Sequence, residues 1–226
     1  MTLPMPFDAS STAVLAIDLH RGYLDPRVSS RPIPQEKIGP IISANKRLFE
    51  MARANGMPII HCVLSPDNLR GQRDPHLQNP LFRWQETTRG KRQPILDPSV
   101  VPAQRGEGDI HPDLAPERGN FVIDSKSSMS CFYGTELERM VRLLGVDTLL
   151  IAGINTNTCV QCAAFDCFNR HLCAVVIEEC VATGYGDDLH EPALENIRRR
   201  LGWVVRLEEL EQALKTPLLT GAGDGR

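Results

Sequence analysis

Apolar runs of strand length alternate with segments of helical spacing along this chain, and this alternation restricts the possible folds. Runs that stay apolar throughout are typical of strands buried on both faces, as in parallel sheets. The predicted strands occupy residues 12–19, 58–64, 121–124, 147–153, 173–178 and 203–206. Helical patterns cover residues 34–55, 135–144, 159–170, 190–201 and 208–215. Because parallel strands need crossover connections, we predict an α/β fold, a doubly wound, mainly parallel six-stranded sheet with helices on both faces.

The chain has 226 residues, enough for one large α/β domain, and no internal repeat or linker divides it. We expect a single domain over residues 12–215, preceded by a flexible leader at 1–11 and followed by a disordered tail at 216–226. Residues 65–120 are polar and rich in Pro, Arg and Gly. Long loops of this kind usually serve as lids or binding loops, so we expect a lid there.

Charge and composition exclude several classes of partner. The formal net charge of −3 gives no reason to expect nucleic-acid binding. The run of Arg198, Arg199 and Arg200 is interpreted as the solvated end of a helix. No stretch approaches the ~20 apolar residues that span a bilayer, and the N-terminus has no signal-peptide pattern. Seven cysteines without export signals indicate reduced thiols, so we expect a cytoplasmic protein.

The junction after Gly153 carries the strongest functional signal. Its apolar run ends in a short polar turn, and Cys159 opens the next helical pattern. A thiol in the first turn of a helix lies at the positive end of the helix dipole, which favours the thiolate. The backbone N–H groups of that turn have no partners within the helix and can hold an oxyanion. The segment predicts covalent catalysis, although a lone cysteine is more often a small buried hydrophobe.

Asp18, Lys126 and Cys159 each lie at or just after the end of a predicted strand. Alone, Asp18 could equally be a helix or turn cap, and Lys126 would more often be a surface lysine. A carboxylate inside an apolar run needs partners, however. In open α/β sheets, ligands bind outside the carboxyl ends of the strands. The convergence of the three residues at one edge of the sheet predicts a catalytic site.

Residues 16–20, 126–135 and 153–160 resemble the isochorismatase-like cysteine hydrolase superfamily, whose members include N-carbamoylsarcosine amidase, nicotinamidase, biuret hydrolase and ureidoacrylate hydrolase. The similarity extends over roughly residues 12–206. It implies an isochorismatase-like, Rossmann-like three-layer sandwich with no cofactor. It also implies a homo-oligomer, often a tetramer, with active sites close to the subunit interfaces.

The resemblance also assigns roles to the three residues. Asp18 would be the general base that takes the proton from Cys159 and later delivers it to the leaving amine. Lys126 would favour both the carboxylate and the thiolate by its charge. The family's cis peptide bond maps to Ile154–Asn155, and the N–H groups of Asn155 and Cys159 would form the oxyanion hole. Water would then hydrolyse a thioester intermediate.

Departures from the family patterns favour one branch. True isochorismatases cleave a vinyl ether and typically lack the cysteine, so Cys159 favours hydrolysis of a C–N bond. Nicotinamidases carry a metal-binding Asp-x-His pattern, which is missing from residues 60–70, so we predict no metal. The expected substrate is a small amide or ureido compound, such as a carbamoylated or biuret-like compound. His20 stands where the family has glutamine, in a structural role or in contact with substrate.

Several aromatic and basic residues near these motifs could line the substrate pocket: Tyr23, Phe132, Tyr133, Tyr185, Trp84, Arg70 and Arg73. Trp84 and the two arginines lie in the expected lid, where a guanidinium could clamp a carboxylate or polarise a ureide oxygen. The alternatives are core packing for the aromatic residues and solvated charge for the arginines, and for each residue alone the alternative is the more common role.

Two other kinds of function stay open. Cys159 and Cys162 have the spacing of a redox or metal-binding motif at a helix start. Cys162 and Cys167 fall in an apolar helical pattern, however, where buried thiols are common. The chain could instead be a non-catalytic interaction protein. The presence of Asp18 and Lys126 together with Cys159 counts against this, because nothing structural requires all three.

Overall fold

A parallel β-sheet forms the centre of the protein in the computed structural model, which describes residues 7–29, 32–64, 80, 81, 84, 106 and 108–215. The strands of this sheet are β1 (Thr12–Ile17), β2 (Ile59–Leu64), β3 (Phe121–Lys126), β4 (Thr148–Ile154), β5 (Cys173–Ala182) and β6 (Trp203–Val205). They lie in the order β3-β2-β1-β4-β5-β6, and all neighbouring pairs are parallel. The predicted six-stranded parallel sheet is confirmed.

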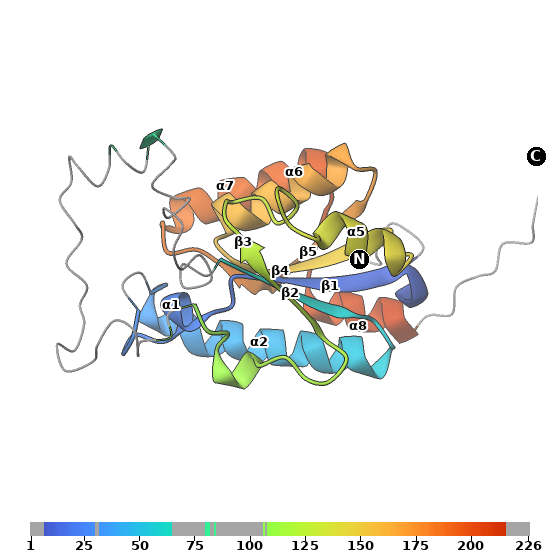
Figure 1. Cartoon of the computed structure of the whole chain (residues 1–226), viewed down its shortest axis with the longest axis horizontal. Helices are drawn as coiled ribbons and strands as arrows, with labels where there is room; N and C mark the ends of the chain where they lie inside the picture. Colours follow the sequence, from blue (N-terminus) through green and yellow to red (C-terminus); the bar gives the residue numbers. More distant parts are fainter. Residues whose placement is uncertain are drawn as a thin grey trace, which may run out of the picture.

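Helices cover both faces of the sheet, as Figure 1 shows. One layer consists of α2 (Gln35–Ala54) and α8 (Leu207–Lys215). The opposite layer consists of α5 (Leu137–Leu143), α6 (Gln161–Asn169) and α7 (Asp187–Asn196). Shorter helical segments are η1 (Ala9–Ser11), α1 (Arg21–Leu24), η4 (Pro112–Leu114), η5 (Thr156–Val160) and η6 (Ile197–Leu201). The chain therefore forms the three-layer sandwich that the alternation predicts.

The core consists of two apolar layers, one on each face of the sheet. Successive residues of a strand point to opposite faces. Ala13, Leu15 and Ile17 of β1 therefore pack with α5, α6 and α7, whereas Val14 and Ala16 pack with α2 and α8. All five side chains are buried. Burial on both faces explains why this strand is apolar throughout.

Several element boundaries differ from the sequence prediction, and the helical segment that carries Cys159 begins earlier than expected, at Thr156 of η5. β5 continues to Ala182, because after a register shift it pairs again with the end of β4. Two consecutive charged residues, Glu178 and Glu179, interrupt the apolar run and conceal this continuation in the sequence. α7 begins at Asp187 and not at His190, and the acidic residues of its first turn complement the helix dipole.

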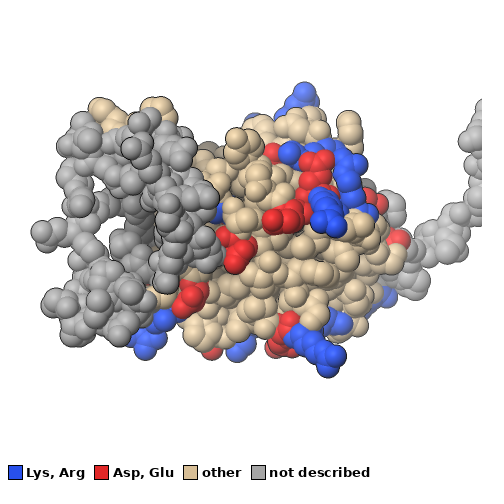
Figure 2. All heavy atoms as spheres, in the orientation of Figure 1, with Lys and Arg blue, Asp and Glu red and all other residues tan. Residues whose placement is uncertain are grey.

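The charged surface is mixed. Figure 2 shows acidic and basic side chains interspersed on the face in view. Arg198 and Arg199 both form ion pairs with Glu195, one turn earlier in the chain, as expected of a solvated helix end. Among the helices in the described ranges, none is both long and apolar enough to cross a membrane.

A buried histidine lies between β2 and α2. His61 is 1% exposed, and its ring meets that of Phe49 edge-on, with 5.4 Å between the ring centroids. Burial, with a smaller contribution from the charge of Arg53, lowers the pKa of His61 to about 4. His61 is therefore neutral in the folded protein at neutral pH.

Acidification is expected to reduce stability through His61. The unfolded chain binds this proton at about pH 6.5, whereas the folded protein resists it until about pH 4, so the free energy of unfolding falls as the pH drops between these values. Between about pH 7 and about pH 5, the wild type should lose about 2 kcal/mol more than His61→Leu, as measured by urea denaturation. Equal losses in the two proteins would show that His61 does not carry this dependence.

Candidate active site

The strand order reverses between β1 and β4, which lie side by side. Ligands of open α/β sheets bind outside the carboxyl ends of the strands at such a point. Asp18 directly follows β1, Lys126 is the last residue of β3, and Cys159 lies in η5, the turn after β4. The topology therefore brings all three residues to one edge of the sheet.

The three side chains are in contact and almost inaccessible to solvent. Lys126 Nζ donates to Asp18 Oδ2 at 2.6 Å and to Cys159 Sγ at 3.4 Å. Asp18, Lys126 and Cys159 are 0%, 1% and 6% exposed, respectively. A buried carboxylate and a buried ammonium each need a partner of opposite charge, and here each supplies the other.

The backbone fixes the orientation of Asp18. Its N–H donates to Cys62 O at 3.0 Å, and its Oδ1 accepts from Leu64 N at 2.7 Å. One carboxylate oxygen is thus held by β2, and the other faces Lys126. Asp18 also has a positive φ of 50°. Such conformations are uncommon for residues with a side chain, and they cluster at functional sites.

Gly153 lets β4 approach β1 closely just before this edge. Its φ is +124°, and a Cβ atom at this position would lie 1.9 Å from the carbonyl oxygen of Ile17. Only glycine fits here, because it lacks Cβ and tolerates positive φ. The close approach places the residues that follow the two strands, Asp18 and the η5 turn, beside each other.

The Cys159 thiol is protonated in this arrangement. Burial raises its pKa, the charge of Asp18 raises it further, and Lys126 offsets these effects only in part, so that the pKa is about 12. Burial opposes the charge of Lys126, but Asp18 and Cys159 raise the pKa of Lys126 well above its ordinary value. Burial and the charge of Asp18 therefore oppose the thiolate that a position near a helix start would favour.

We expect Cys159 to show no thiolate over the neutral pH range. The difference in thiolate ultraviolet absorbance between wild type and Cys159→Ala should stay flat between about pH 6 and about pH 9. A raised pKa keeps the proton on sulfur throughout this range, which is the opposite of a helix-activated cysteine. A titration step below about pH 8 would overturn this assignment.

The turn after β4 is organised by Asn155. The Ile154–Asn155 peptide bond is cis, as the family resemblance implies. The carbonyl oxygen of Asn155 accepts from Thr158 N and Val160 N at 3.1 and 3.2 Å. Its side-chain Oδ1 accepts from Gly184 N at 3.0 Å, so the segment after β5 is attached to this turn.

The sequence pattern of the isochorismatase domain matches residues 12–209 of the chain. The chain belongs to the isochorismatase family. The matched region includes Asp18, Lys126 and Cys159, together with all six strands of the sheet.

Named relatives of this isochorismatase family member include hydrolases. Ureidoacrylate amidohydrolase RutB of Methylobacterium radiotolerans is 29% identical over 228 residues, covering 97% of this chain and 86% of that protein. A cysteine hydrolase structure from Pseudomonas syringae pv. phaseolicola superimposes with a TM-score of 0.74 at 18% identity, covering 95% of this chain and 97% of that chain. N-carbamoylsarcosine amidase from Thermoplasma acidophilum superimposes with a TM-score of 0.63 at 20% identity, covering 87% and 96%. The two structures show the shared fold.

Two aromatic candidates lie at the catalytic edge of this isochorismatase domain. Tyr23 stacks on His20, with 4.6 Å between the ring centroids. Burial raises the pKa of Tyr23, and the charges of Asp18 and Cys159 raise it further, so its hydroxyl lies within electrostatic reach of both. Tyr185 is exposed and also acts on the Tyr23 pKa.

The other two aromatic candidates follow Lys126 in the chain and differ in burial. Phe132 is buried in the apolar layer, and the guanidinium of Arg170 lies 4.5 Å from its ring centroid. Tyr133, the next residue, is exposed. These positions tie Phe132 to α6 and leave Tyr133 at the surface.

Most of the expected lid, residues 65–120, lies outside the described residues, and so do Arg70 and Arg73. Trp84 is described and is exposed. Near the end of this region, Ile110 forms an antiparallel bridge with His20, which lies two residues after Asp18. This bridge lies directly before α1, which carries Tyr23.

The seven cysteines are free thiols. Cys162 Sγ donates to Asp166 Oδ2 at 3.9 Å, whereas Cys159 faces Lys126. The two cysteines of the Cys-x-x-Cys spacing therefore have different partners. Within the part of the chain that the structure describes, no group of three or more His, Cys, Asp or Glu side chains could hold a metal ion.

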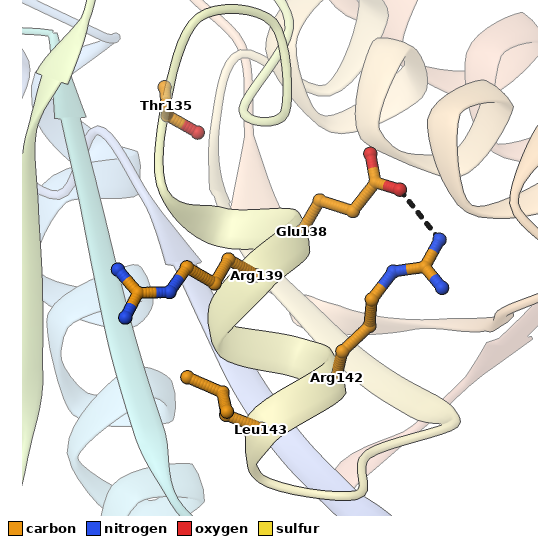
Figure 3. Close-up of a pocket in the computed structure, with 5 residues that line it drawn as sticks. All are labelled: Thr135, Glu138, Arg139, Arg142 and Leu143. Atoms are coloured by element: carbon orange, nitrogen blue, oxygen red, sulfur yellow. Dashed lines mark hydrogen bonds and ion pairs between the residues drawn. The ribbon is translucent and has the colours of Figure 1, made fainter.

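An open hollow on α5 lies apart from this edge. Its lining consists of Thr135, Glu138, Arg139, Arg142 and Leu143. Figure 3 shows two of these side chains, Glu138 and Arg142, paired at 2.7 Å along the helix. The lining includes none of the three candidate catalytic residues.

Sequence reasoning missed the residues that attach the turns to one another. Thr183 Oγ1 donates to Asn157 Oδ1 at 2.6 Å, and Gly184 N donates to Asn155 Oδ1 at 3.0 Å. A signal was available, because these polar residues follow β4 and β5, which pair as neighbours. Ends of neighbouring parallel strands meet at the same edge of a sheet, so the contacts could have been predicted once the strand order was known.

Proposed function

We propose that this protein is a cysteine-dependent amidohydrolase that cleaves a C–N bond of a small amide or ureido compound and releases ammonia or an amine. The observation that carries the proposal is the buried contact of Lys126 Nζ with Asp18 at 2.6 Å and with Cys159 at 3.4 Å. A relative named ureidoacrylate amidohydrolase supports the ureido class of substrate.

In the first half of the reaction, Asp18 is the general base. Because Cys159 is protonated, its thiol transfers the proton to the Asp18 carboxylate as the sulfur attacks the substrate carbonyl carbon. Lys126 keeps its proton and stabilises the negative charge of both neighbours. The backbone N–H groups of Asn155 and Cys159 hold the tetrahedral oxyanion, since N–H groups at the start of a helical turn lack partners within it.

In the second half, Asp18 is the general acid and then again the base. The protonated carboxyl gives its proton to the leaving nitrogen as the C–N bond breaks, which leaves a thioester on Cys159. Water attacks the thioester carbon and gives a proton to Asp18, and the C–S bond breaks. The proton then returns to the sulfur, and the carboxylate and the thiol are restored.

Tyr23 and Tyr185 are the residues that we assign to the substrate pocket. The raised pKa of Tyr23 keeps its hydroxyl neutral near Asp18 and Cys159. A neutral hydroxyl both donates and accepts hydrogen bonds, and a ureido group offers one carbonyl oxygen and several N–H groups. The residues of the expected lid would complete the pocket.

Other reactions of the family have weaker support. Cleavage of a vinyl ether does not use a thiol nucleophile, so the contact of Cys159 with Lys126 favours C–N hydrolysis over an isochorismatase-type reaction. A redox pair of Cys159 and Cys162 is disfavoured by their separate partners. A purely structural role would leave no reason to bury the Asp18–Lys126 ion pair, which costs desolvation energy.

Ammonia release from a panel of small amides and ureides tests the proposal. The panel contains biuret, N-carbamoyl amino acids, ureidoacrylate, maleamate and nicotinamide. We expect the wild type and Cys162→Ala to turn over at least one compound that Cys159→Ala does not. Activity that depends on Cys162 would favour the redox interpretation instead.

The reactivity of the thiol gives a substrate-free check. Asp18 should assist alkylation of Cys159 by iodoacetamide by taking the proton of the thiol, so site-resolved mass spectrometry should show faster labelling of Cys159 in wild type than in Asp18→Asn. The proposal fails if no compound is turned over and Cys159 of the wild type reacts no faster than Cys159 of Asp18→Asn.

The assembly and location are also proposed. Phe165 and Phe168 are exposed one turn apart on α6, and burial of such a pair in a homo-oligomer would be favourable. Light scattering decides this, because a mass of 25.1 kDa would mean a monomer. Seven free thiols suit the reducing cytoplasm, and the mixed charge of Figure 2 supports small-molecule substrates over nucleic acid.

A further inference from the structure

The segment between β3 and α5, residues 127–136, directly follows Lys126 and is called here the β3–α5 loop. The loop returns to the core at Cys131 and Phe132, which are buried in the same apolar layer as Cys159. Whatever holds this loop therefore also restrains the end of β3, where Lys126 meets Asp18 and Cys159.

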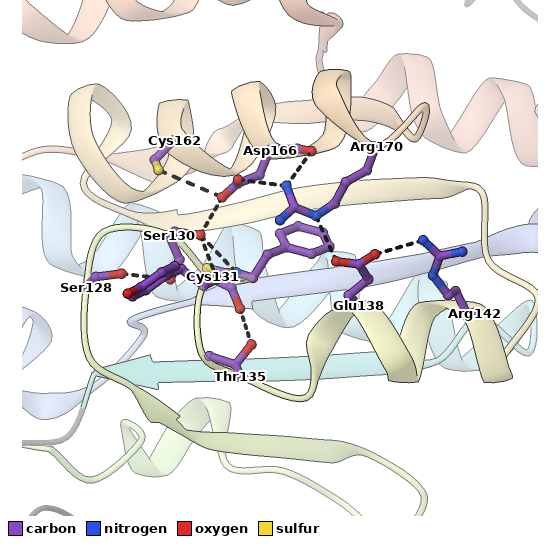
Figure 4. A network of polar contacts seen from close by, with 11 residues as sticks. Ser128, Ser130, Cys131, Thr135, Glu138, Arg142, Cys162, Asp166 and Arg170 are labelled. Atoms are coloured by element: carbon purple, nitrogen blue, oxygen red, sulfur yellow. Dashed lines mark hydrogen bonds and ion pairs between the residues drawn. The ribbon is translucent and has the colours of Figure 1, made fainter.

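The hydroxyl of Ser130 closes the turn of this loop. Ser130 Oγ accepts from Phe132 N at 3.1 Å and from Tyr133 N at 2.9 Å. Ser130 Oγ in turn donates a hydrogen bond to Asp166 Oδ2 at 2.6 Å, and these two residues are 36 positions apart in the chain. Figure 4 shows Ser130 of the loop and Asp166 of α6 facing each other in this contact. The loop is thereby attached to the helix that continues from the Cys159 turn.

The second oxygen of Asp166 is also in use. Asp166 Oδ1 accepts from Arg170 Nη1 at 2.9 Å, and Arg170 Nε donates to Glu138 Oε2 of α5 at 3.2 Å. The Arg170 guanidinium covers the ring of Phe132. Asp166 therefore connects α6 with the β3–α5 loop through Ser130, and with α5 through Arg170 (Figure 4).

We propose that Asp166 is a positioning residue for the reaction. By accepting the hydrogen bond of the Ser130 hydroxyl, Asp166 fixes the β3–α5 loop against α6. The fixed loop in turn holds the Lys126 ammonium at its distance from the Cys159 sulfur. The inference rests on the proposed function, because it concerns the same Lys126 and Cys159. Neither Asp166 nor Ser130 touches the reacting atoms.

The hydrogen bonds around residue 166 require a carboxylate there. Ser130 Oγ already accepts two backbone N–H groups, so its remaining need is an acceptor for its own proton. In Asp166→Asn, the amide oxygen would face either Ser130 or Arg170, and the NH₂ group would face the other. Because Arg170 has only donors, the amide oxygen turns to it, and Ser130 then meets a donor.

The test compares Asp166→Asn, Ser130→Ala and the double variant with wild type. We expect kcat for ammonia release to fall about 10-fold to 100-fold, because a small displacement of a catalytic group has such effects. The KM should stay within about threefold, since substrate contacts are unchanged. The double variant should be no worse than either single variant, because both remove one contact. Alkylation of Cys159 by iodoacetamide should slow in parallel.

The matched control is Glu138→Gln, which weakens the other partner of Arg170 and leaves the Ser130–Asp166 contact intact. It should retain the wild-type kcat. A merely structural role for Asp166 would lower the melting temperature but leave kcat per folded enzyme and Cys159 alkylation unchanged, and that result would overturn the inference. Additive losses in the double variant would also overturn it. If Asp166→Asn does not fold, Ser130→Ala gives the same readouts.

The two proposals fail in different ways. If wild-type Cys159 is alkylated no faster than in Asp18→Asn and no substrate is turned over, the proposed function falls, and the positioning role falls with it. If wild type is active and both Ser130→Ala and Asp166→Asn match it, only the positioning role is wrong.

Discussion

Lys126→Met is expected to lower ammonia release by about 10²- to 10⁴-fold, the range attributed to a general base, although Lys126 is not itself the base. The Lys126 side chain is completely buried and forms the ion pair with Asp18. Without it, the buried Asp18 carboxylate loses its partner of opposite charge, and the negative charge that forms on the Cys159 sulfur loses its neighbouring cation. Removal of one partner of a buried pair also costs about 3–5 kcal/mol of stability. Steady-state kinetics and urea denaturation measure the two effects.

The double variant Asp18→Asn/Lys126→Met separates the two effects. It removes both charges, so much of the lost stability should return, while activity should stay absent because the base is gone. Lys215→Met is the matched control, since Lys215 pairs with Glu211 on the exposed face of α8. It should change stability by less than about 1 kcal/mol and leave kcat unchanged. Full activity of Lys126→Met would show that Lys126 has no part in the reaction.

The fold could be predicted from the sequence because parallel strands are apolar on both faces. β1 and β4 stand out for this reason, and every residue of both is buried. The same rule failed at the end of β5, where Glu178 and Glu179 interrupt the run although the strand continues. Local composition cannot show that a strand resumes pairing after a register shift, because the shift depends on the neighbouring strand.

The positions of the candidate catalytic residues could be predicted, but their protonation could not. Asp18, Lys126 and Cys159 follow strand ends, and topology alone brings them to one edge. The protonation of the Cys159 thiol depends on burial and on the net effect of two neighbouring charges, and burial has the largest influence on its pKa. A pattern that places a cysteine at a helix start indicates the helix dipole alone, and it contains neither the burial nor the Asp18 charge that raise the pKa of Cys159.

Contacts between distant residues were the least predictable part of the site. Ser130 and Asp166 have no local pattern that marks them as partners, because their contact requires the loop after β3 to lie against α6. Phe132 and Tyr133 illustrate the same limit, since neighbours in the sequence have opposite environments, one buried and one exposed. Proximity to a motif therefore identified Tyr23 and Phe132 equally well, although Phe132 packs in the apolar layer beneath Arg170 and Tyr23 lies within electrostatic reach of Asp18 and Cys159.

Gly153→Ala is expected to destabilise the protein by about 4 kcal/mol or more, at the extreme end for single substitutions. The new Cβ would lie 1.9 Å from Ile17 O and 2.7 Å from Ile17 N, so β1 and β4 would have to separate. The φ of +124° is also unfavourable for alanine. The separated strands would carry Asp18 away from Cys159, so the fraction that still folds should be inactive. Thermal and urea denaturation measure the loss of stability.

Gly39→Ala provides the matched control for the same chemical change. Gly39 lies within α2, and a Cβ atom there would have nothing within 4 Å. Alanine is the better helix former, but Pro40 disfavours a helical conformation for the residue before it, so this variant should change stability by less than about 1 kcal/mol and keep its activity. The difference between the two variants follows from the close backbone approach and the positive φ at Gly153, because both variants add one methyl group. Normal stability of Gly153→Ala would mean that β1 and β4 can separate at this edge without loss, and that the closeness of Asp18 to Cys159 does not depend on Gly153.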